Sequence, residues 1–140
     1  MAALLAAAPA FAQQRLLEPG APDSARPAAL QVLQYLAEGN IEAAAALSNA
    51  PQRRLEVLRA YRDRVGEDVF RRIYSRYFAP ENRLIAEVAL GPRRLLVWDL
   101  GEADHHIAGQ IYVESGGKFL LDDEPSRERA ELRALLKKYR

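Results

Sequence analysis

The first half of the chain carries apolar residues at spacings of three and four, which is the pattern of helices with one buried face. Leu30, Leu33 and Ala37 illustrate the pattern in the first of them. Gly39 and Gly66 stand where two of these periodic segments end, and glycine is common just past a helix C-terminus. The helices are predicted over residues 24–40, 41–48, 51–65 and 69–78.

From residue 83 onward the apolar residues alternate with others at a period of two, which indicates β-strands. Gly91-Pro92 and Ser115-Gly116-Gly117 are typical of tight turns between such strands. The strands are predicted over residues 83–90, 93–100, 106–114 and 118–123. Ser126 then opens a last helix that runs to Arg140 and carries an apolar stripe.

Helices followed by a strand meander predict an α+β fold. We expect N-terminal helices packed on an antiparallel sheet of about four strands, with an extra C-terminal helix. Alternation places Leu95 and Val97 opposite Leu96 and Trp98, so both faces of the sheet are apolar. We expect the last helix to fold back over its own sheet, with weak homodimerisation beside it.

The N-terminal segment resembles a secretory signal peptide. Residues 1–12 contain a short apolar run that ends in Ala10-Phe11-Ala12, and no basic residue precedes it, as in a clipped signal sequence. We therefore expect a flexible mature N-terminus over residues 13–25, a single domain over residues 26–140, and a periplasmic or secreted location in a bacterium.

Composition narrows the function classes. The chain has 140 residues, no cysteine and a net charge of +1, so disulfides and thiolate chemistry are absent and no global charge favours nucleic acid. We expect no transmembrane segment, because no stretch of the chain approaches the required length. No phosphate-binding glycine loop or nucleophile elbow occurs, and we expect no cofactor.

The order of elements and the hairpin Gly116-Gly117-Lys118-Phe119-Leu120-Leu121-Asp122-Asp123 resemble the nuclear transport factor 2-like superfamily over residues 26–124. The resemblance implies a curved sheet that wraps a helical layer into a cone, and small secreted bacterial members are among its relatives. Enzymes of that superfamily place Asp, His, Tyr or Arg inside the cone. The C-terminal helix departs from the family's usual pattern.

Two sets of residues are candidates for chemistry. His105 and His106 are adjacent and point to opposite faces of a strand, so we predict no metal site. Asp99, Glu87 and His106 would carry acid–base catalysis if the protein were a small isomerase, dehydratase or hydrolase. We expect one face of the sheet to form the interior, and this leaves Asp99, Glu87 and His106 on the outer face. The residues assigned to the inner face are Leu84, Ala86, Val88, Leu96, Trp98, Ile107 and Ile111.

We therefore interpret the chain as an exported, non-catalytic binding or assembly module with either a filled apolar core or a small apolar pocket. Its partner would be a small apolar ligand or an envelope component. The arginines of the third and fourth helices are interspersed with acids, as on a solvated face. The aromatic residues expected to line the interior are Tyr35, Tyr61, Phe70, Tyr74, Trp98 and Phe119.

Overall fold

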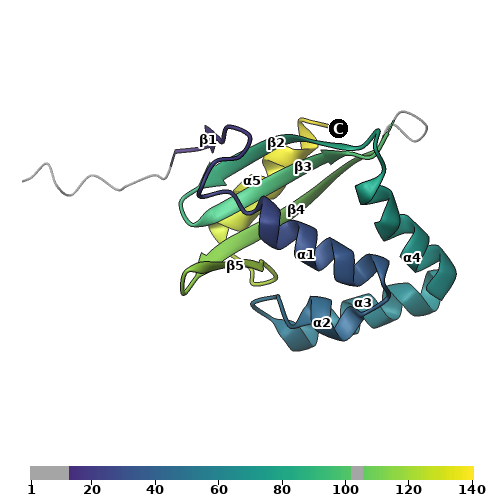
Figure 1. Cartoon of the computed structure of the whole chain (residues 1–140). Coiled ribbons are helices and arrows are strands. Elements are labelled where there is room, and N and C mark those ends of the chain that lie inside the picture. Colours follow the sequence, from purple (N-terminus) through teal and green to yellow (C-terminus); the bar gives the residue numbers. More distant parts are fainter. Residues whose placement is uncertain (1–12, 102–105) are drawn as a thin grey trace, which may run out of the picture.

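An open antiparallel sheet forms the middle layer of the protein (Figure 1). The computed structural model describes residues 13–101 and 106–140, and within them the sheet has five strands in the order β1-β2-β3-β4-β5. The strands are β1 (Arg15–Leu16), β2 (Arg83–Leu90), β3 (Arg93–Asp99), β4 (Ile107–Ser115) and β5 (Lys118–Leu121). At the β4–β5 turn, Gly116 and Gly117 have φ of 60° and 85°. Positive φ at both central residues is what a type I′ hairpin turn requires.

The N-terminal helices cover one face of the sheet. They are α1 (Arg26–Ala37), α2 (Ile41–Ala45), α3 (Pro51–Val65) and α4 (Glu67–Ser75), followed by the short 3-10 helix η2 (Arg76–Phe78). The Asn40 side chain accepts a hydrogen bond from Ala43 N–H at 3.2 Å and so caps α2. Their core includes Leu33, Leu58 and Phe70, which pack with Leu96 and Trp98 of β3.

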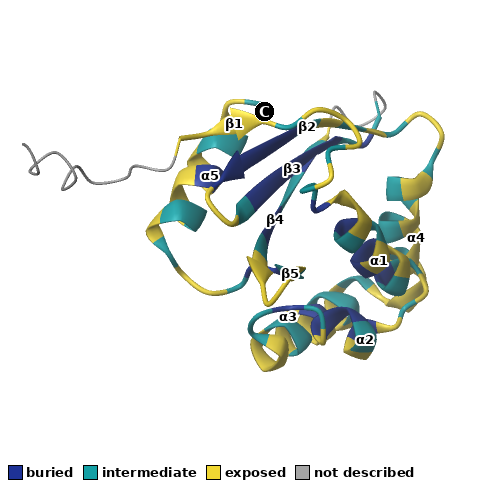
Figure 2. Cartoon of the chain, turned by 60° about the vertical axis from the view of Figure 1, so that its left-hand side comes forward, coloured by how far each residue is buried: buried dark blue, intermediate teal, exposed yellow. Residues whose placement is uncertain are grey.

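The helix α5 (Arg127–Lys137) covers the opposite face (Figure 2). The hydroxyl of Ser126 accepts a hydrogen bond from Arg129 N–H at 3.0 Å and caps the helix. Leu132 is fully buried against Leu95 and Val97 in a second core, so the predicted fold-back of the last helix is confirmed. Among the residues that the structure describes, no helix has both the length and the apolar character to cross a bilayer.

The predicted α+β class, the N-terminal helices and the C-terminal helix are confirmed, but the expected number of about four strands was wrong. The fifth strand, β1, lies in the segment predicted as a flexible N-terminus and pairs Arg15 with Ala89 of β2. Arg15 also forms an ion pair with Asp23 at 2.8 Å. This segment therefore contributes an edge strand to the sheet.

The predicted inward face was wrong for two of the strands. In β4, Ala108 and Tyr112 face the N-terminal helices, while Ile111 faces α5. In β2, an irregularity between Leu84 and Ala86 shifts the register. It leaves Leu84 with the helices and sends the following apolar residues, Ala86, Val88 and Leu90, to α5. Because helices cover both faces, alternation alone does not reveal which face of a strand meets which layer.

Candidate functional site

A cleft opens between the α3–α4 helix pair and the ends of β3 and β4 that lie nearest to Leu100 and His106. Its volume is about 700 Å³. Three tyrosines, Tyr61, Tyr74 and Tyr77, form much of its wall. The cleft is as large as a small-molecule site, and its lining combines apolar surface with a few polar groups, as such sites do.

The tyrosines belong to a chain of aromatic contacts that runs from α3 to β3. Tyr61 lies 5.8 Å from Phe70, and Phe70 lies 4.9 Å from Tyr74, measured between ring centroids. Tyr74 stacks on Tyr77 at 6.1 Å, and Tyr77 meets Trp98 edge-on at 5.7 Å. Contacts of this kind add about 0.5–1.5 kcal/mol per pair beyond simple burial and fix ring orientations. The tyrosine wall is therefore held by the core behind it.

Burial raises the pKa of both Tyr74 and Tyr77 above the ordinary tyrosine value. Their hydroxyl groups are therefore neutral at physiological pH and can donate a hydrogen bond as well as accept one. The wall offers a ligand the apolar surface of aromatic rings.

Basic side chains line the cleft beside the tyrosines. The Arg64 guanidinium lies over the Tyr61 ring, 5.2 Å from its centroid. Arg76 donates to the carbonyl of Leu100 at 3.1 Å, and His106 lines the same end. The described residues of the lining include no Asp or Glu. The exposed Arg64 therefore places a positive charge beside the tyrosine wall.

The predicted aromatic residues occupy three kinds of position. Tyr61 and Tyr74 line the cleft, whereas Phe70 and Trp98 lie buried behind it. Tyr35 is partly buried against the helical core, and Phe119 lies on β5 beneath the guanidinium of Arg94, at 5.2 Å. Tyr77 was missed by the sequence analysis, although it belongs to the same helical stripe as Phe70 and Tyr74.

Glu87 has a role that the sequence did not indicate. It faces the N-terminal helices and is only 6% exposed. Its carboxylate accepts hydrogen bonds from the Ser24 hydroxyl at 2.5 Å and from Ala25 N–H at 2.7 Å. Because α1 has no side-chain cap of its own, this carboxylate binds the free backbone donor at the helix start. Glu87 therefore joins α1 to β2.

The structure does not bring together Asp99, Glu87 and His106. Asp99 lies on the α5 side near Arg83, with the two charged groups 3.9 Å apart. Glu87 of β2 lies opposite Leu96 of β3, and Leu96 lies opposite Gln110 of β4. His106 is four residues before Gln110 in the chain. Strand geometry then separates Glu87 from His106 by roughly 16 Å. Asp99 lies one register step from His106, but strand alternation directs these two side chains to opposite faces of the sheet.

Part of the histidine segment, residues 102–105 with Glu102, Asp104 and His105, lies outside the described residues. Within the described ranges, no group of three His, Cys, Asp or Glu residues is placed to hold a metal ion.

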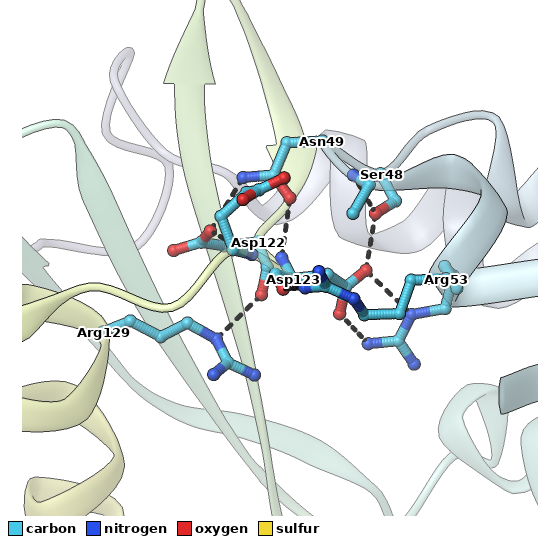
Figure 3. A network of polar contacts seen from close by, with 9 residues as sticks. Ser48, Asn49, Arg53, Asp122, Asp123 and Arg129 are labelled. Carbon is cyan, nitrogen blue, oxygen red and sulfur yellow. Dashed lines mark hydrogen bonds and ion pairs between the residues drawn. The ribbon is translucent and has the colours of Figure 1, made fainter.

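A polar network that the sequence analysis missed joins the α2–α3 connection to the segment after β5 (Figure 3). Asp123 accepts hydrogen bonds from the Ser48 hydroxyl at 2.5 Å and from Arg54 Nε at 2.9 Å. Asp122 accepts from Asn49 Nδ2 at 2.8 Å and from Arg93 Nε at 2.9 Å. All four carboxylate oxygens have partners within the protein, because Arg54 also binds the second oxygen of Asp123. The network therefore joins the two loops and satisfies the buried carboxylates.

The fold and the cleft define an α+β protein whose open sheet is covered by helices on both faces, with an aromatic cleft at one end of the sheet. Comparisons with known protein families, with curated proteins and with solved structures find no match.

Proposed function

We propose that this chain is an exported, non-catalytic binding module whose aromatic cleft takes a small apolar ligand with an acidic group. The cleft itself carries the proposal: a wall of Tyr61, Tyr74 and Tyr77 stands beside Arg64, with no carboxylate among the described lining residues. Flat apolar ligands gain dispersion and hydrophobic contact on such a wall. The resemblance to the nuclear transport factor 2-like superfamily is compatible with this function and is part of the proposal.

The rim of the cleft supports the proposal. Val57 lies on α3 beside the opening and is 51% exposed, although it is a large apolar residue. Bound ligand would remove the remaining exposed half of this side chain from water, which would contribute about 1 kcal/mol. The arrangement of Glu87, Asp99 and His106 offers no comparable support for catalysis.

The proposal is tested with 8-anilinonaphthalene-1-sulfonate, a fluorescent aromatic anion of suitable size. We expect saturable binding to the folded protein. Arg64→Glu should weaken it by about tenfold, because a charge reversal replaces attraction by repulsion. Val57→Asp should weaken it by a similar factor. Both changes fall on exposed positions and leave the core intact.

Arg59→Glu is the matched control, since Arg59 is exposed on the same helix and does not line the cleft. It should leave the affinity within about twofold. Equal losses in Arg59→Glu and Arg64→Glu would show that the dye responds to net charge alone. Binding that is unchanged in both cleft variants would refute the assignment of the ligand to this cleft.

A further inference from the structure

One half of β4 has an open edge. The strand β5 pairs only with Tyr112–Ser115, and the last bond on that side joins Asp122 N–H to the carbonyl of Ile111 at 2.9 Å. Figure 1 shows β5 beside only one end of β4. Among the described residues, no strand pairs with 107–110 on this side.

The register with β3 shows which backbone groups face this edge. Leu100 N–H donates to the carbonyl of His106 at 2.9 Å, so alternate residues from His106 onward bond to β3. The backbone groups of Gly109 therefore point away from β3. The same alternation leaves the carbonyl of Ile107 at the open edge, where it accepts a hydrogen bond from Arg140 Nε at 3.1 Å.

A groove of about 690 Å³ follows this edge between α5 and the N-terminal helices, with Gly109–Ile111 at its floor. It differs from the aromatic cleft because α5 forms one of its walls, although the two share Arg54, Tyr74 and Tyr77. Three basic residues of α5 line the groove, Arg129, Arg133 and Lys137, and Arg140 joins them just beyond the end of the helix.

The positive charge of the groove is largely uncompensated. Asp122 is the one acid among the described lining residues, and Asn49 and Arg93 occupy both of its carboxylate oxygens. Arg133 and Lys137 are exposed, and neither forms an ion pair with a described residue. An occupant of this groove therefore gains from carrying negative charge.

We propose that the open edge of β4 binds an extended acidic segment of a partner protein by adding it to the sheet as a strand. The added strand would form hydrogen bonds with the free backbone groups of Gly109, and its side chains would point alternately to the two sides of the groove. Acidic side chains would face Arg133 and Lys137, and apolar ones would face Tyr74 and Tyr77. The acids would also draw the Arg140 side chain from the carbonyl of Ile107, where it now shields the edge.

A second copy of this chain is the less suitable occupant. Pairing β4 with β4 of another molecule would bring two α5 walls together, with Arg133 and Lys137 repeated on each side. Like charges that face one another across an interface weaken it. The argument rests on the β4 edge and α5, so it stands independently of the ligand proposed for the aromatic cleft.

The test uses a labelled nine-residue peptide of alternating valine and glutamate, with both ends blocked, and measures its binding by fluorescence anisotropy at low ionic strength. We expect saturable binding and slower hydrogen exchange at the Gly109 amide. Reversing both charges in Arg133→Glu/Lys137→Glu should weaken binding by about tenfold or more. The matched control is Lys118→Glu/Lys138→Glu, because both lysines are exposed, neither lines the groove, and the net charge changes by the same amount.

Backbone pairing is tested with two further peptides, N-methylated either at every valine or at every glutamate. In a strand, alternate residues direct their N–H groups to opposite sides, so one of these peptides should lose binding and the other should retain it. Equal binding by both would overturn strand addition, and so would an absence of binding by the parent peptide.

Two other outcomes would also overturn the proposal. One is oligothymidylate that binds as tightly as the peptide and leaves the Gly109 amide unprotected. The other is self-association in sedimentation that protects the same amide, which would identify a second copy as the occupant.

Discussion

Replacing Gly109 by alanine tests whether α5 packs on the sheet as described. Gly109 lies in β4 and does not have a positive φ, so its backbone conformation is open to alanine. On that ground alone, Gly109→Ala would stabilise the protein by about 0.4–1 kcal/mol, because it lowers the entropy of the unfolded chain. The position of α5 reverses this expectation.

A Cβ atom at position 109 would lie 2.4 Å from Cδ2 of Leu136 and 2.8 Å from its Cδ1. Carbon atoms in contact are normally about 3.5–4.0 Å apart, so Leu136 would have to move by roughly 1 Å. Overpacking of this kind costs about 1–3 kcal/mol. After subtraction of the entropic gain, we expect Gly109→Ala to destabilise the protein by up to about 2.5 kcal/mol, with the smaller costs if the end of the Leu136 side chain turns away.

The assay is urea unfolding of four proteins: the wild type, Gly109→Ala, Leu136→Ala and the double variant. Leu136→Ala removes the side chain that the new methyl group would meet. In that background, Gly109→Ala should be neutral or stabilising, so the effects of the two substitutions should not add. A stabilising effect of Gly109→Ala in the wild-type background would refute the close approach of α5 to β4. Strict additivity would refute it as well.

Four further predictions follow from other contacts. Glu87→Ala should cost about 3 kcal/mol and Glu87→Gln less, because the alanine leaves the Ala25 N–H donor and the Ser24 hydroxyl unpaired; thermal unfolding measures both, and equal small losses would contradict the role in joining α1 to β2. Deleting residues 125–140 should destabilise the protein and cause self-association in sedimentation, because it uncovers Leu95 and Val97; a truncated protein that is equally stable and strictly monomeric would contradict this. Burial raises the pKa of Tyr74, Tyr77 and Tyr112 in the folded protein. Their contribution to the free energy of unfolding is therefore complete below about pH 10 and is lost as the pH rises through their folded-state pKa values. Absorbance at 295 nm should show that these three of the six tyrosines ionise only when the protein unfolds. Exported protein should begin at Gln13, and N-terminal sequencing that finds Met1 would exclude cleavage after Ala12.

The sequence could predict the elements because their local signals are strong and agree with one another. The stripe of Phe70 and Tyr74 identifies α4, and Gly116-Gly117 places the last hairpin within a residue or two. The sidedness of the strands could not be predicted. In β4 the neighbouring residues Ile111 and Tyr112 are both apolar and buried, although they point to opposite faces of the sheet. The sequence therefore does not show which of the two faces meets the N-terminal helices. The irregularity beside Leu84 also changes the phase within a single strand.

The polar contacts were beyond prediction for a different reason. Glu87 and Ser24 are 63 positions apart in the chain, and Ser48 and Asp123 are 75 apart. Nothing in the local sequence distinguishes a buried, fully bonded carboxylate from a solvated one. The cleft was predictable only in part. Tyr61 and Tyr74 are recognisable as members of apolar helix stripes, but tertiary packing decides which residues of a stripe line a cleft and which are covered.

Burial of the sheet on both faces also explains where binding features can form. The N-terminal helices and α5 occupy the two faces, so the parts of the sheet itself that stay accessible are its ends and edges. At one edge, β1 pairs with β2 near Ala89, and at the other, β5 covers β4 only from Tyr112 onward. The aromatic cleft and the basic groove both adjoin the uncovered part of β4, and Tyr74 and Tyr77 line both. The features that a ligand and a partner could use therefore lie next to each other, at the one part of the β4 edge that β5 leaves uncovered.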